Sequence, residues 1–174
     1  MWLIVACGDP SRAAGPPEAY VKGLQLAKEG KHREALRIFR QVAKDHPELP
    51  GLHYNMGNVL FRLGEASEAV GAYQEAIRID PKDADAHYNL AMVYSVMDEM
   101  ELAMNVLEEV VRIRPNDGEA LYRLAMGHYS RRNVERAWSY LTLAKKAGYP
   151  VPPQLEEALK GQVVPPAGKG KGNP

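Results

Sequence analysis

Small and aromatic residues recur along this chain at a fixed interval of 34 residues. Four alanines and four tyrosines follow the interval: Ala35, Ala69, Ala103, Ala137, Tyr20, Tyr54, Tyr88 and Tyr122. Between these positions, apolar residues return every three to four residues, as they do on one face of an α-helix. The pattern therefore predicts repeated helical units.

Glycine and proline divide each unit into two helices. In the second unit, Gly64 separates two apolar-periodic stretches, and Pro81 forbids continuation of the second stretch as a helix. The 34-residue step also joins Pro47, Pro81 and Pro115. Each unit is thus predicted to be a helix-turn-helix hairpin. One hairpin cannot bury its apolar face alone, so neighbouring hairpins are expected to stack into a solenoid.

A 34-residue unit with small residues at Gly57 and Ala69 and a closing Pro81 resembles the tetratricopeptide repeat, or TPR. The resemblance implies an all-α, right-handed α-solenoid of four hairpins, framed here as 16–49, 50–83, 84–117 and 118–151. Asp98 and Arg132 depart from the pattern, because they stand where the first two units have the turn glycines Gly30 and Gly64.

Three further segments flank the predicted repeats. Residues 152–160 show helical spacing of Leu155, Ala158 and Leu159 and are expected to form a capping helix on the last hairpin. Residues 161–174 are rich in Gly, Pro and Lys and are expected to be disordered. Residues 1–15 combine a short apolar run with a Gly/Pro-rich tether.

The family places the first helices of successive units on a concave surface that receives a peptide or a partner's helix. Thirteen residues are therefore predicted to form a partner-binding groove: Tyr20, Tyr54, Asn55, Asn58, Phe61, Arg62, Tyr88, Asn89, Met92, Tyr122, Arg123, Met126 and Tyr129. The aromatic and methionine side chains offer contact area, and the asparagine amides offer hydrogen bonds to a peptide backbone. The tyrosines are equally candidates for packing between hairpins. We expect a non-enzymatic interaction scaffold that binds a protein or peptide with some apolar character.

Composition and residue spacing argue against several other classes of protein and site. Lys+Arg and Asp+Glu both number 22, so the net charge is zero, and a helical-repeat RNA-binding protein is the less favoured reading because it needs a basic groove. There is one cysteine, which excludes a disulfide framework. The pair His53 and His87 lacks a third ligand at a suitable spacing. We therefore expect no nucleic acid, metal, cofactor or catalytic residue, whereas pairing of two copies through exposed hairpin faces stays open.

The single cysteine supports a more specific alternative. Ile4-Val5-Ala6-Cys7 resembles a bacterial lipobox, whose cysteine carries the lipid of the mature protein. A signal of this kind needs a basic n-region and a longer apolar stretch, so either the true start lies upstream of Met1 or the match is accidental. If Cys7 is lipidated, the module is a lipid-anchored assembly factor for pili, secretion or the outer membrane on the periplasmic side of the bacterial envelope. Otherwise it is expected to be cytoplasmic.

Overall fold

Nine α-helices and no strand make up residues 15–161, the part of the chain that the computed structural model describes. This confirms the predicted all-α class. The helices fall into two units, divided between Ile79 and Asp80. The predicted lipobox with Cys7 and tail residues 162–174 lie outside the described residues.

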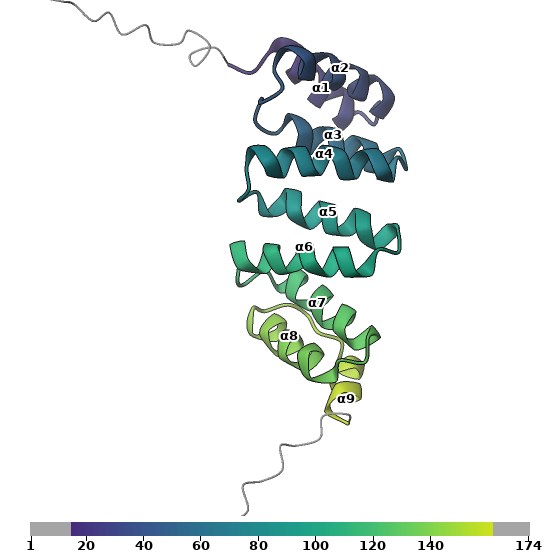
Figure 1. The fold of residues 1–174 in the computed structure, drawn as a ribbon, viewed down its shortest axis with the longest axis vertical. Coiled ribbons are helices and arrows are strands. Elements are labelled where there is room, and N and C mark those ends of the chain that lie inside the picture. Colours follow the sequence, from purple (N-terminus) through teal and green to yellow (C-terminus); the bar gives the residue numbers. More distant parts are fainter. Residues whose placement is uncertain (1–14, 162–174) are drawn as a thin grey trace, which may run out of the picture. The chain divides into compact units, whose positions relative to one another are not determined.

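Unit 1 holds two hairpins, whose helices are α1 (Glu18–Lys28), α2 (His32–Asp45), α3 (Leu52–Arg62) and α4 (Ala66–Ile79). Each helix packs on the next one along the chain, and α1 also touches α3 (Figure 1). Two glycines allow the close approach within the hairpins. A Cβ at Gly23 would lie 2.5 Å from the Phe39 ring, and one at Gly57 would lie 2.7 Å from the Tyr73 ring.

Unit 2 holds two hairpins and a shorter helix: α5 (Ala84–Val96), α6 (Met100–Ile113), α7 (Gly118–Ser130), α8 (Val134–Lys146) and α9 (Pro153–Lys160). The α5–α6 and α7–α8 pairs form the hairpins, α6 packs on α7, and α9 packs on α8. Asp83, Asp117 and Asn133 cap the N-termini of α5, α7 and α8 by accepting backbone N–H bonds. The core of the unit includes the buried residues Met104, Leu107, Val110, Leu124 and Leu141.

The second helices of the hairpins keep the 34-residue step. They begin at His32, Ala66, Met100 and Val134. The first three end two residues before Pro47, Pro81 and Pro115, as the proline pattern predicts. No helix in the described residues is long and apolar enough to span a membrane.

The turn inside each hairpin has a left-handed residue. Gly30 and Gly64 take φ angles of 78° and 79°, and Asp98 and Arg132 take 63° and 59° at the equivalent positions. The two departures from the glycine pattern therefore preserve the turn geometry rather than change it. Their side chains carry a steric cost that glycine avoids.

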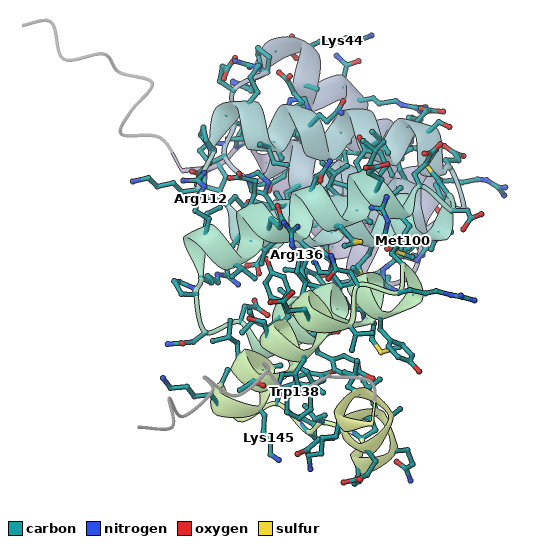
Figure 2. All side chains as sticks on the ribbon, turned by 60° about the horizontal axis from the view of Figure 1, so that its bottom comes forward. Lys44, Met100, Arg112, Arg136, Trp138 and Lys145 are labelled. Carbon is teal, nitrogen blue, oxygen red and sulfur yellow. The ribbon has the colours of Figure 1, made fainter. Side chains whose placement is uncertain are left out.

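The short helix α9 occupies the segment predicted for a cap. Leu159 is completely buried and belongs to one cluster with Ala125, Ala137 and Leu141. Trp138 and Lys145 lie on the side of α8 next to α9 (Figure 2), where Lys145 Nζ donates to Glu156 Oε2 at 2.9 Å. The cap thus covers the apolar side of the last hairpin and leaves charged groups at its edge.

Candidate functional site

The first helices of unit 1 are joined by a polar contact between α1 and α3. Asn55 Nδ2 donates to Tyr20 Oη at 2.9 Å and to the Gly51 carbonyl at 2.7 Å. Tyr20 is only 7% exposed, and its ring centroid lies 5.8 Å from that of Phe39. Burial raises the pKa of Tyr20, against the effect of the Asn55 hydrogen bond. Tyr20 therefore stabilises the packing of the helices instead of offering open surface to a partner.

Asn55 was predicted to bond a peptide backbone through its amide. Both hydrogens of that amide are engaged inside the chain, one by Tyr20 and one by Gly51. These bonds hold α3 to α1, and the contact of Asn55 with a peptide backbone stays a prediction.

On α3, two residues of the predicted groove, Tyr54 and Asn58, contact Tyr73 of α4. Tyr73 Oη donates to Asn58 Oδ1 at 2.7 Å, and the Tyr54 ring meets the Tyr73 ring edge-on with centroids 6.2 Å apart. Phe61 and Arg62 follow at the end of the helix, and both are exposed. Phe61 is 36% exposed and Val21 of α1 is 49% exposed, which leaves apolar surface on the first helices of this unit.

In unit 2 the first helices α5 and α7 are joined by three polar side chains. Arg123 Nε donates to Tyr88 Oη at 2.7 Å, and its Nη2 donates to Glu119 Oε1 at 2.9 Å. The guanidinium carbon also lies 5.6 Å from the centre of the Tyr88 ring. Burial and a hydrogen bond to Glu119 raise the pKa of Tyr88 to about 12, with Arg123 acting in the opposite direction. Tyr88 is therefore neutral at physiological pH.

The apolar members of the predicted site in unit 2 differ in exposure. Met126 is 39% exposed on α7, whereas Met92 on α5 is half-buried against the core of the unit. Tyr129 is half-buried against the cluster that contains Leu159. Tyr122 stacks on Tyr149 with centroids 5.1 Å apart, and Asn89 is half-buried. Met126 is thus the exposed apolar residue of the set, three positions after Arg123 on α7, and the others are half-buried.

The sequence did not reveal how the repeated tyrosines are bonded. Tyr20 pairs with Asn55, and Tyr88 pairs with Arg123, in both cases with a residue 35 positions later. This separation is one 34-residue repeat plus one position. In each case the sixth residue of a repeat bonds the tyrosine that is the fifth residue of the repeat before it. The sequence does contain a sign of these bonds, because a hydrogen-bonding residue directly follows the repeated tyrosine in Tyr54-Asn55 and in Tyr122-Arg123. Periodicity alone does not show that this residue bonds the tyrosine of the preceding repeat.

The two histidines set aside as metal ligands are bonded to the backbone. His53 Nε2 donates to the Pro47 carbonyl at 2.8 Å, and His87 Nε2 donates to the Pro81 carbonyl at 3.2 Å. Both bonds tie the start of a first helix to the loop before it. Within residues 15–161, no three His, Cys, Asp or Glu side chains are placed to hold a metal ion.

Three family models match the chain, each described as a TPR repeat or tetratricopeptide repeat. They match residues 26–73, 57–95 and 84–117, and together span more than half of the sequence. The helix hairpins that repeat every 34 residues have the architecture that these family models describe. The chain belongs to the tetratricopeptide repeat family.

Solved structures of other TPR proteins share this fold. A crystal structure of MamA is 21% identical with a TM-score of 0.71, and the match covers 83% of this chain and 80% of that one. YrrB, described as a TPR protein with an unusual peptide-binding site, is 20% identical with a TM-score of 0.67, over 74% and 66% of the two chains. The first TPR of Spaghetti (RPAP3), bound to an HSP90 peptide, is 23% identical with a TM-score of 0.61, over 66% and 90%. No curated protein matches this TPR chain in sequence.

Proposed function

We propose that this TPR protein is a non-catalytic interaction module that binds a peptide or a partner's helix on its first helices. The observation that carries the proposal is the first-helix surface of unit 2, formed by Tyr88, Met92, Arg123, Met126 and Tyr129. It combines exposed apolar area at Met126 with a fixed guanidinium at Arg123. Apolar area supplies affinity, and a held polar group supplies orientation.

The internal bonds of this surface favour binding at low entropic cost. Arg123 is held by Tyr88 and Glu119, so a partner does not have to order that long side chain when it docks. The hydrogen bond from Tyr88 also lowers the pKa of Glu119, which keeps the carboxylate ionised and bonded to Arg123 at neutral pH. YrrB and the RPAP3 domain support the proposal as relatives in fold whose descriptions include a peptide-binding site or a bound peptide.

A matched pair of variants tests the proposal. Met126 on α7 and Leu143 on α8 are 39% and 45% exposed, but only Met126 lies on a first helix. Peptides enriched from a random library on the full chain are titrated against the wild type, Met126→Glu and Leu143→Glu. We expect Met126→Glu to weaken binding at least about tenfold, because it replaces apolar contact area by a carboxylate that loses water when the peptide covers it. Leu143→Glu should bind as the wild type does.

Both substitutions fall at exposed positions, so the helix content measured by circular dichroism should not change. Equal affinity of the wild type and folded Met126→Glu would contradict the proposal. A selective loss in Leu143→Glu would move the binding surface to the second helices.

The lipobox-like sequence Ile4–Cys7 favours a second, more specific proposal, in which the same module is lipid-anchored in a bacterial envelope and helps to assemble its machinery. Mass spectrometry of the N-terminal peptide from protein made in its own host tests this proposal. A diacylated or triacylated Cys7 as the first residue is the expected result. An unmodified N-terminus at Met1 or Trp2 would remove the envelope proposal and leave the interaction module in place.

A further inference from the structure

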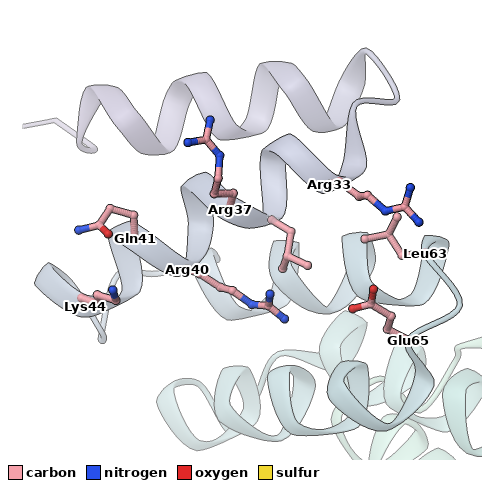
Figure 3. A pocket seen from close by; sticks show the side chains of 8 residues that line it. Arg33, Arg37, Arg40, Gln41, Lys44, Leu63 and Glu65 are labelled. Atoms are coloured by element: carbon pink, nitrogen blue, oxygen red, sulfur yellow. The ribbon is translucent and has the colours of Figure 1, made fainter.

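A pocket of about 450 Å³ opens in unit 1 along helix α2, and none of its lining residues belongs to the proposed binding surface. Helix α2 forms one wall, and the end of α3 with the start of α4 forms the other (Figure 3). Leu36 and Leu63 contribute apolar side chains to the lining. Leu36 is buried and Leu63 half-buried, so they make a floor rather than a rim.

Four cations of α2 surround this floor. Arg33, Arg37, Arg40 and Lys44 all line the pocket and all are exposed. Their spacing of four, three and four residues keeps them on one face of the helix. Arg33 lies near Leu63 and Glu65 in Figure 3, and Lys44 lies at the other end of the row.

Three of these cations lack an ionic partner within the described part of the chain. Arg40 forms a salt bridge with Glu68, whereas Arg33, Arg37 and Lys44 form none in residues 15–161. Glu65 is the one carboxylate that lines the pocket. The lining therefore carries an excess of positive charge over an apolar floor.

The spacing of the cations suits an extended peptide. With a rise of about 1.5 Å per residue, Arg33, Arg37, Arg40 and Lys44 are about 4.5 to 6 Å apart along α2. Side chains on one side of an extended strand repeat about every 6.6 to 6.8 Å. Carboxylates at alternate positions of such a strand would reach successive cations of α2. The guanidinium groups match a carboxylate with two parallel hydrogen bonds.

We propose that this pocket is a second binding site, which takes an acidic, extended peptide segment with at least one apolar side chain. Carboxylates of the segment bind Arg33 and Arg37, and its apolar side chain packs on Leu36 and Leu63. Glu65, the carboxylate of the lining, accepts a backbone N–H of the segment. The site uses residues outside the first-helix surface of unit 2, so it stands independently of that surface.

The acidic side chains around the pocket favour a peptide over a nucleic acid. Glu65 lines the pocket, and Glu68 near the start of α4 is paired with Arg40, so both interrupt the basic surface. A phosphate backbone carries a charge on every nucleotide and would meet these carboxylates along its path. A peptide carries negative charge only on selected side chains, so its charged groups can lie beside the cations and away from these carboxylates.

Fluorescence anisotropy on the full chain tests the proposal with a labelled octapeptide in which glutamate alternates with leucine and serine. The comparison peptide has glutamine at each glutamate position, and a labelled oligouridine is the nucleic-acid probe. The variant is Arg33→Gln with Arg37→Gln, and glutamine preserves helix propensity. The control is Lys82→Gln with Lys146→Gln, which removes the same charge at two exposed residues of unit 2.

We expect the glutamate peptide to bind saturably, and more weakly as salt is raised. The Arg33/Arg37 variant should lose about tenfold or more in affinity, and the Lys82/Lys146 control should stay within about twofold of the wild type. Absence of saturable binding, equal binding of the glutamine peptide, or equal affinity of the Arg33/Arg37 variant would each overturn the proposal. Tighter binding of oligouridine, lost in that variant, would overturn it in favour of a nucleic-acid site.

Discussion

Gly57 illustrates at the scale of one residue how tightly a hairpin of this protein is closed. A Cβ there would lie 2.7 Å from the ring of Tyr73, which is 1% exposed and donates to Asn58. The ring cannot move away without breaking that bond. We expect Gly57→Ala to lower the free energy of unfolding by about 1–3 kcal/mol, as measured by urea denaturation.

Gly71 is the matched control for this prediction. It lies on α4, and a Cβ added to it would meet nothing within 4 Å. Gly71→Ala should therefore raise the free energy of unfolding by up to about 1 kcal/mol through helix propensity alone. If Gly57→Ala is as stable as Gly71→Ala, the close contact between α3 and Tyr73 is misplaced.

His128 links the stability of unit 2 to pH. Its ring is 6% exposed and stacks on Tyr140 with centroids 5.4 Å apart. Burial lowers the pKa of His128 below the ordinary value of 6.5; Arg136 and Arg131 act in the same direction, and Glu108 opposes them. The unfolded chain therefore takes up a proton before the folded protein does. Stability should fall as the pH is lowered through about 6.5 and level off below the folded pKa.

Replacement of this ring by phenylalanine separates titration from packing. Nε2 of His128 is buried and has no hydrogen-bond partner within residues 15–161. His128→Phe retains an aromatic ring against Tyr140 and removes both the proton uptake and the unpaired nitrogen. We expect it to lose less stability than the wild type between pH 7 and pH 5 in urea denaturation. Parallel losses in the two proteins would show that His128 does not carry the pH dependence.

Sequence reasoning identified the repeated tyrosines but not their individual roles. Tyr20 and Tyr88 occupy the same position of their repeats, yet Tyr20 is buried on Phe39 and Tyr88 is half-buried beside Arg123. Periodicity assigns a residue to a face of a helix. It does not assign burial, because burial depends on the neighbouring side chains that each hairpin happens to carry.

At the scale of the elements, substitutions in the hairpin turns measure how much stability a side chain in the left-handed conformation removes. Arg132 has a φ angle of 59° at a position where Gly30 and Gly64 adopt similar angles. Arg132→Gly should raise stability by about 1 kcal/mol, since the penalty for a left-handed side chain exceeds the added freedom of glycine in the unfolded chain. Asp98→Gly should gain less, because aspartate tolerates this conformation better. Thermal unfolding of both variants gives the comparison, and a loss of stability in Arg132→Gly would contradict it.

The elements themselves were largely predictable from the sequence. The 34-residue step fixes where the second helices begin, and prolines fix where three of them end. Helix α9 was predictable from the spacing of Leu155, Ala158 and Leu159. The left-handed conformations of Asp98 and Arg132 were not, because their side chains obscure the glycine signal that marks the other two turns.

At the scale of the whole molecule, each unit has its own first-helix surface. Unit 1 exposes Phe61 and Val21, and unit 2 exposes Met126 beside Arg123. The basic pocket belongs to unit 1 and lies mainly on α2. A repeat protein can thus use different faces of its hairpins for different ligands, because each hairpin contacts only its neighbours and leaves both outer faces accessible.

Hydrogen–deuterium exchange of the full chain, with and without a library-selected peptide, would show directly which helices receive a partner. We expect slower exchange in the first helices of the hairpins when the peptide is bound, above all in α5 and α7, with α6 and α8 changed little. Slower exchange confined to α6, α8 or α9 would contradict the assignment of partner binding to the first helices.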